Sequence, residues 1–147
     1  MTLRAETIRE RLRKLREVLS NLQDVRKVPP KEFLASYRHY WLAERGLQLA
    51  AEAVFDIGNH ILAGHFNLHS SNYEDLIKRL AGQGVLSAQL REKLRGLGGF
   101  RNVLVHGYLD IDMDRVLSIL HEELESFEAF AQATEAWLEG LPDGAVS

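Results

Sequence analysis

The amino-acid sequence predicts an all-α fold, a bundle of four main helices with a short fifth helix. Only three prolines occur in 147 residues, so few positions are barred from a helix interior. Apolar residues recur at steps of three and four along most of the chain, which is the period of one helix face. The length predicts a single domain over residues 1–140, followed by a loose C-terminal tail over 141–147.

The first two predicted helices are the longest stretches of helical period. Residues 3–23 carry a single apolar stripe made by Ile8, Leu12, Leu15, Leu19 and Leu22. Two adjacent prolines then predict the start of a second helix, over about 30–63. This span exceeds the usual globular helix, so we expect either a bend near Gly46 or Gly58 or a surface that pairs with another chain.

The second helix also carries two sets of side chains of functional interest. Its aromatic residues, expected to be core or dimer anchors, are Tyr37, Tyr40 and Trp41. Its carboxylates at steps of eight and four are Glu44, Glu52 and Asp56. These carboxylates are candidates to line a groove facing the motif described below, and the alternative is that they only keep the helix surface soluble.

Two shorter helices and a final long one complete the predicted bundle. Ser71 or Asn72 is expected to cap a helix over 73–82, and Ser87 to open another through Leu97. Gly98 and Gly99 interrupt the pattern after it. After the turn DIDMD, the last helix runs to about residue 139.

Charge is distributed unevenly between the two parts of the chain. Residues 110–147 hold ten acidic residues against Arg115 alone, a net charge of −9. Because the whole chain carries −3, residues 1–109 carry +6. This asymmetry permits a basic face for a polyanion beside an acidic C-terminal element, and solvated helix faces are the alternative.

Composition excludes several classes of protein. The chain has no cysteine, which excludes disulfides, thiolate zinc sites and a cysteine nucleophile, and fits a cytoplasmic protein. No segment approaches the roughly 20 apolar residues that span a bilayer, and the basic N-terminal stretch lacks a signal-peptide core, so we expect no membrane association. A cluster of histidines, His60, His65 and His69, has no nearby carboxylate to complete a metal site. We therefore expect neither a metal nor another cofactor.

The stretch FRNVLVHGY contains the most promising candidates for chemistry. Arg101, Asn102, His106 and Tyr108 fall within eight positions. On an unbroken helix, Asn102 and His106 share a face, whereas Arg101 and His106 lie about 140° apart. Arg101 and His106 therefore converge only if the backbone turns between them or a second chain supplies one of them. A guanidinium can clamp a phosphodiester and an imidazole can transfer a proton, although a helix cap with a surface pair is the alternative.

The same stretch resembles the signature of HEPN domains, and in particular that of HepT-like toxins. RNVLVHGY follows the pattern R-x4-H-x-Y. Two upstream segments also resemble this branch: ERGLQLAAEAVFDIGNHILA at 44–63, and YEDLIKRLAGQGVLSAQLREKLRGLGGF at 73–100. The three segments stand in the family's order, and the resemblance covers roughly residues 5–130.

The resemblance implies a function and specific residue roles. It implies a homodimer whose motifs meet in a cleft and act as a metal-independent ribonuclease on tRNA or mRNA. Arg101 and His106 would be catalytic, and Asn102 would orient the site. An MNT-type nucleotidyltransferase antitoxin, in a type VII-like toxin–antitoxin pair, would neutralise the toxin by AMPylation of Tyr108. The alternative is a non-catalytic helical interaction module that binds, or is the substrate of, the nucleotidyltransferase.

Overall fold

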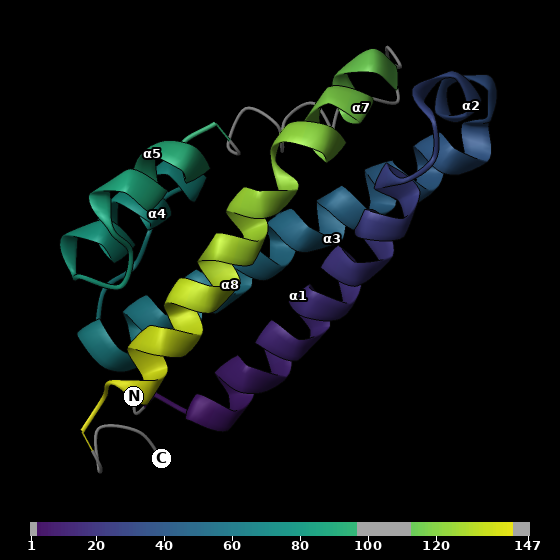
Figure 1. Cartoon of the computed structure of the whole chain (residues 1–147). Helices are drawn as coiled ribbons and strands as arrows, with labels where there is room; N and C mark the ends of the chain where they lie inside the picture. Colours follow the sequence, from purple (N-terminus) through teal and green to yellow (C-terminus); the bar gives the residue numbers. More distant parts are fainter. Residues whose placement is uncertain (1–2, 97–112, 143–147) are drawn as a thin grey trace.

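The computed structural model describes residues 3–96 and 113–142, and every element in those ranges is helical. Figure 1 shows the helices along the chain. They are α1 (Ala5–Arg26), α2 (Pro30–Ala35), α3 (Tyr37–Ile61), the π-helical turn η1 (Leu62–Phe66), α4 (Tyr73–Gly82), α5 (Ala88–Leu94), α7 (Met113–Glu122) and α8 (Leu124–Glu139). The predicted all-α class is confirmed.

Three long helices form the centre of the molecule. In Figure 1 the three helices lie along the same diagonal, and α1 is antiparallel to α3 and α8. The predicted stripe of α1, from Ile8 to Leu22, is buried against α3 and α8. Phe33, Phe127 and Phe130 are fully buried in the same core. Burying an aromatic or aliphatic side chain of this size contributes about 1.5 to 3 kcal/mol each, so apolar packing dominates the stability of the bundle.

Ion pairs and a hydrogen bond connect the surfaces of α1 and α8. Arg26 donates to Glu125 at 2.6 Å, and Gln23 donates to Glu128 at 3.0 Å. Near the other end of α1, Arg9 contacts Glu135 at 3.4 Å. The acidic residues of α8 therefore face the basic surface of α1, although exposed pairs of this kind contribute at most about 1 kcal/mol each.

The predicted single helix over 30–63 is wrong at one point, because the chain breaks at Ser36. That residue is extended, with φ −132° and ψ 116°, and separates α2 from α3. The break allows α2 to fold so that Phe33 is fully buried, while Tyr37 begins a new helix with 60% of its surface exposed. At the other end, α3 runs into η1, which stops at Asn67 in the left-handed conformation with φ 53°.

The two glycines considered as bends instead let helices approach closely. A Cβ atom on Gly46 would lie 2.5 Å from Leu22 Cδ2, and one on Gly58 would lie 2.8 Å from Leu76 Cδ1. Both distances are far below normal carbon contacts. Gly46 therefore permits the packing of α3 on α1, and Gly58 the packing of α3 on α4.

Helices α4 and α5 form a pair on one side of the bundle, on the left in Figure 1. Both predicted caps are present: Asn72 Oδ1 accepts from the Asp75 N–H at 2.8 Å, and Ser87 Oγ accepts from the Leu90 N–H at 3.0 Å. Helix α4 contacts α3, and α5 contacts α8. The final predicted helix is divided at Glu123 into α7 and α8.

Candidate functional site

The R-x4-H-x-Y motif lies outside the described residues. The prediction that the helix opened by Ser87 runs through Leu97 is wrong, because α5 ends at Leu94 and a turn follows at residues 95–96. The described chain stops at Gly96, two residues past the end of α5, and resumes at Met113 in α7. Helix α5 packs on α8, and α7 packs on α2 and α3. The two elements that flank the motif in sequence are therefore both anchored in the bundle. The roles assigned to Arg101, Asn102, His106 and Tyr108 remain predictions.

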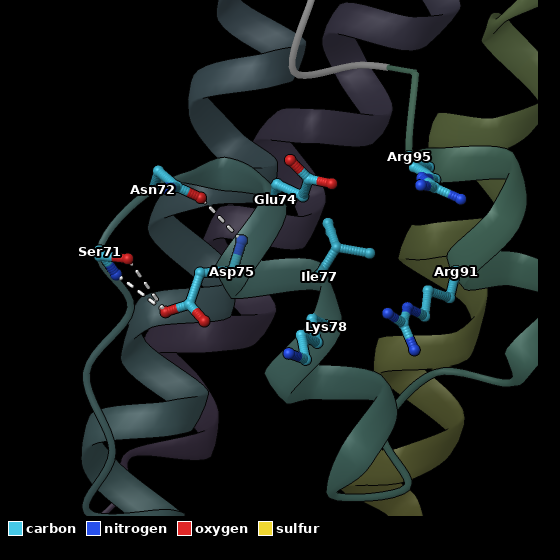
Figure 2. Close-up of a pocket in the computed structure, with 8 residues that line it drawn as sticks. All are labelled: Ser71, Asn72, Glu74, Asp75, Ile77, Lys78, Arg91 and Arg95. Carbon is cyan, nitrogen blue, oxygen red and sulfur yellow. Dashed lines mark hydrogen bonds between the residues drawn. The ribbon is translucent and has the colours of Figure 1, made fainter.

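A pocket of about 430 Å³ lies between α4 and α5, immediately upstream of the motif in sequence. Figure 2 shows residues of α4 facing Arg91 of α5 and Arg95, the residue that follows α5, with the guanidinium of Arg91 extending toward α4. The cationic residues that line the pocket are Lys78, Arg91 and Arg95, and its one apolar lining residue, Ile77, belongs to the buried core. Its size falls within the range of about 300 to 1,000 Å³ that small-molecule sites occupy.

One of the two acidic residues of this pocket is already engaged. The Asp75 carboxylate accepts from the Ser71 backbone N–H at 3.0 Å and from Arg79 Nε at 2.9 Å. These bonds to the charged form lower the pKa of Asp75 below its usual value, with the Ser71 N–H as the largest cause. Glu74 is the other acidic residue in the lining.

A second acidic position lies at the junction between α7 and α8. Partial burial raises the pKa of Glu123 above its usual value, although a hydrogen bond from Ser126 opposes the shift. Tyr73, at the start of α4, is 4% exposed, and its hydroxyl has no hydrogen-bond partner within the described ranges. Burial raises the pKa of this phenol and the charge of Glu123 raises it further, so Tyr73 is neutral at physiological pH.

The carboxylates proposed as cleft-lining are distributed along α3. Glu44 is half-buried, while Glu52 is exposed and accepts from Gln48 at 3.4 Å. Asp56 accepts from Arg11 of α1 and lies 3.5 Å from His60. None of the three lines the α4–α5 pocket, and their position relative to the motif stays a prediction.

The aromatic residues of α3 separate into core and surface. Tyr40 is 4% exposed and belongs to the core, whereas Tyr37 and Trp41 are 60% and 61% exposed. The rings of Tyr37 and Trp41 contact each other edge-on, with centroids 4.9 Å apart. Leu34 and Leu42 are also exposed, at 41% and 59%, and we call these four exposed apolar residues of α2 and α3 the α2–α3 patch.

The histidine cluster does not assemble as a metal site. His60 is near Asp56, whereas the ring of His65 packs edge-on against Trp137, with centroids 5.1 Å apart. Among the described residues, no group of three or more His, Cys, Asp or Glu side chains could hold a metal ion. In the same ranges, no helix is long and apolar enough to cross a membrane.

Sequence reasoning did not identify the cationic lining of the α4–α5 pocket. Arg91 lies in α5 and Arg95 is its C-cap residue with helical backbone angles, so the two arginines, four residues apart, lie on one side of the end of α5. This four-residue spacing of two arginines directly before the motif is the sequence signal that could have indicated a cationic surface there. The contribution of Lys78 depends on the packing of α4 against α5 and has no counterpart in local sequence.

Comparisons with known proteins agree with the fold. A model of the family described as "Ribonuclease HepT-like" matches residues 6–134. The tRNA nuclease HepT of Aphanizomenon flos-aquae is 29% identical over 132 residues, which are 89% of each chain. The mRNA nuclease HepT of Shewanella oneidensis is 31% identical over 90 residues, 61% of this chain and 68% of the relative.

A solved structure is also similar to the whole bundle. It contains the tri-AMPylated Shewanella oneidensis HEPN toxin in complex with MNT antitoxin, and superposes with a TM-score of 0.78. The sequence identity is 25%, and the match covers 88% of this chain and 96% of that chain. Because the family match spans most of the chain, including positions 101–108, the protein belongs to the HepT-like ribonuclease family of HEPN domains.

Proposed function

We propose that this protein is the ribonuclease toxin of a type VII-like toxin–antitoxin pair, acting on tRNA or mRNA. The observation that carries the proposal is the family match over residues 6–134, because it includes both the helical bundle and the R-x4-H-x-Y motif. Relatives named as a tRNA nuclease and an mRNA nuclease support this substrate class.

The proposed reaction uses the arginine and the histidine of the motif. His106 removes a proton from an RNA 2′-hydroxyl or from water, and the oxygen of that nucleophile attacks phosphorus. The bond from phosphorus to the leaving ribose oxygen breaks, and that oxygen takes up a proton from the imidazolium or from water. Arg101 stabilises the negative charge that develops on the phosphate in the transition state. Asn102 orients the site. No step in this scheme requires a metal ion, and attack by a 2′-hydroxyl would exclude DNA as a substrate.

We infer that a nucleotidyltransferase antitoxin of the MNT type neutralises the protein by AMPylation of Tyr108. An AMP group would place a bulky anion two residues from His106, where it would block the site and repel an RNA phosphate. The tri-AMPylated HEPN toxin in complex with MNT antitoxin supports this proposal.

We further propose that the protein is a homodimer and that the α2–α3 patch contributes to its interface. Exposed Tyr and Trp side chains are enriched among residues that dominate binding energy. Helix α2, which carries Leu34 of the patch, packs against α7, whose first residue follows Tyr108 by five positions. Five residues span at most about 18 Å, so pairing through the patch would hold two copies of the motif at neighbouring ends of two bundles.

The ribonuclease proposal is tested by incubating the purified protein with total tRNA and with mRNA in the presence of EDTA. We expect cleavage by the wild type and by Tyr108→Phe, and a loss of at least about 10²-fold in His106→Ala, since general acid–base catalysis typically contributes that much. Intact RNA with both the wild type and Tyr108→Phe would contradict the ribonuclease proposal. It would favour a non-catalytic module that binds the antitoxin.

The neutralisation proposal is tested by intact-mass measurement after incubation with the antitoxin and ATP. We expect added AMP units on the wild type and none on Tyr108→Phe. Tyr37→Phe is the matched control, because Tyr37 is a tyrosine with 60% of its surface exposed in the single chain and phenylalanine keeps the ring that the proposed interface uses. Modification that persists in Tyr108→Phe would place the acceptor elsewhere.

A further inference from the structure

We propose that the α4–α5 pocket binds phosphate groups of the RNA that the motif cleaves. This inference rests on the proposed ribonuclease function and adds a binding surface beyond the four motif residues. Its lining residues come from two helices on the N-terminal side of the motif. The pocket would hold the substrate backbone while Arg101 and His106 act on one phosphodiester.

The three cations of the pocket are available for a ligand. Within the described part of the chain, Lys78 and Arg91 have no ion-pair partner. Arg95 has a single loose partner, Glu92 at 3.8 Å, and both side chains are about two-thirds exposed. Exposed pairs at such distances contribute little free energy, so binding an anion would cost few existing interactions.

The acidic residues of the lining do not cancel this positive charge. Asp75 is bound by the Ser71 N–H and by Arg79, a cation outside the lining. Glu74 is the remaining acid, on the α4 side of the pocket in Figure 2. Three cations against one free carboxylate leave the pocket with a net positive charge, concentrated on α5.

The chemistry of the pocket fits a nucleic-acid backbone better than a protein surface. A guanidinium presents paired donors that match two phosphate oxygens. Lysine contributes a point charge suited to phosphate and is depleted at the centre of protein–protein interfaces. Ile77 also lines the pocket but is only 2% exposed, so the groups that a ligand can reach there are almost all polar or charged.

The location of the pocket agrees with this role. Arg95 precedes Arg101 by six residues, and a chain of that length spans at most about 22 Å. A strand bound at the pocket therefore lies within a few nucleotides of the motif. Contacts of this kind position the backbone but carry no sequence information, so the pocket would bind tRNA and mRNA alike.

The inference is tested by salt-dependent binding of a fluorescein-labelled 20-nucleotide single-stranded RNA, with His106→Ala as the background to prevent cleavage. Each phosphate contact on a single strand contributes about 0.7 to the slope of log affinity against log salt. We expect Arg91→Gln/Arg95→Gln to lower that slope by about 1.4, which corresponds to about fifteenfold weaker binding at 0.15 M salt. DNA of the same sequence should lose affinity to the same extent.

The matched control is Lys93→Gln, on the same helix. Lys93 is exposed but lines a different pocket, which it shares with acidic residues of the α7–α8 junction. We expect Lys93→Gln to leave the slope within experimental error of the wild type. Since Arg and Gln have similar helix propensities, both variants should keep the wild-type melting temperature.

Cleavage kinetics in the otherwise wild-type protein separate the outcomes. The inference predicts that Arg91→Gln/Arg95→Gln raises KM with little change in kcat. Unchanged KM and salt slope, in a protein that cleaves RNA, would overturn the inference and leave the ribonuclease proposal intact. A wild type that neither binds nor cleaves RNA would remove the ribonuclease proposal itself. Loss of the antitoxin complex with unaltered RNA binding would assign the pocket to the antitoxin and contradict the inference.

Discussion

Single ionisable residues make the pH dependence of this fold predictable. Asp75 and Glu123 are both carboxylates near the start of a helix, but their pKa values shift in opposite directions. Asp75 is half-buried but accepts hydrogen bonds from the Ser71 N–H and from Arg79, which favour its charged form. Glu123 is partly buried, which disfavours its charged form. The direction of each pKa shift is therefore decided by burial and by nearby hydrogen-bond donors, and not by the type of residue.

Glu123→Gln should raise stability at neutral pH. Because the native pKa of Glu123 is raised, the folded state binds its proton more tightly than the unfolded state. Stability therefore falls as pH rises from the ordinary glutamate value of 4.5 through the raised native value. Thermal melts from pH 3 to pH 8 should show a higher melting temperature for Glu123→Gln at pH 7 and no difference near pH 3.

The neighbouring Glu122→Gln is the control for that prediction, because Glu122 is exposed and its replacement removes the same charge. An equal gain in both variants would mean that relief of general repulsion among the C-terminal acids, rather than burial of Glu123, is responsible. A loss of stability in Glu123→Gln at pH 7 would contradict the prediction directly.

At the level of helices, local sequence was enough for most boundaries. Caps at Asn72 and Ser87 and the apolar stripe of α1 depend on residues within one or two turns, and all were predicted. The break at Ser36 was not, since no glycine or proline occupies that position. It follows from burial of Phe33 in a core assembled by distant helices.

The candidate site could also be predicted only in part, because some of its residues are brought together by packing between helices that are distant in sequence. Residues 101–108 stand out as a motif because their spacing is local, whereas the α4–α5 pocket joins Lys78 to arginines 13 and 17 positions away. Helical period alone could not separate exposed Tyr37 and Trp41 from buried Tyr40, because the break at Ser36 changes how the start of α3 faces the core.

Close packing of helices predicts the effect of substitutions at the glycines. Gly58→Ala would place a Cβ 2.8 Å from a methyl group of Leu76, which is fully buried. We expect overpacking to cost about 1 to 3 kcal/mol, more than the gain of up to about 1 kcal/mol from better helix propensity. Chemical denaturation should therefore show a net loss of up to about 2 kcal/mol.

Gly82→Ala provides the comparison, because among the described residues no atom outside its own helix backbone and its two chain neighbours lies within 4 Å of the added Cβ. There only the propensity term operates, and the variant should be as stable as the wild type or slightly more stable. If Gly58→Ala were stabilised as much as Gly82→Ala, the close approach of α3 to α4 would not be the reason for glycine at position 58.

For the whole molecule, the α2–α3 patch predicts the oligomeric state. Trp41→Glu replaces an aromatic ring that is 61% exposed by a charge, so it should weaken a dimer without disturbing the core. Light scattering after gel filtration should give about 33 kDa for the wild type, twice the 16.7 kDa of one chain, and 16.7 kDa for the variant.

Gln83→Glu introduces the same charge at an exposed residue after α4 and should remain dimeric. A dimeric Trp41→Glu with wild-type melting temperature would assign the interface to another surface. Since the proposed site needs two copies of the motif, a monomeric Trp41→Glu should also lose most of its ribonuclease activity.

The packing of α1 on α8 has a consequence for synthesis of the protein. The first and the last described helices share one core, so the apolar stripe of α1 lacks part of its cover until the final quarter of the chain has left the ribosome. The motif at 101–108 emerges before that point. A nascent chain would therefore expose the proposed reactive residues before the fold that positions them is complete, and a chain truncated before α8 should accumulate no folded, active toxin.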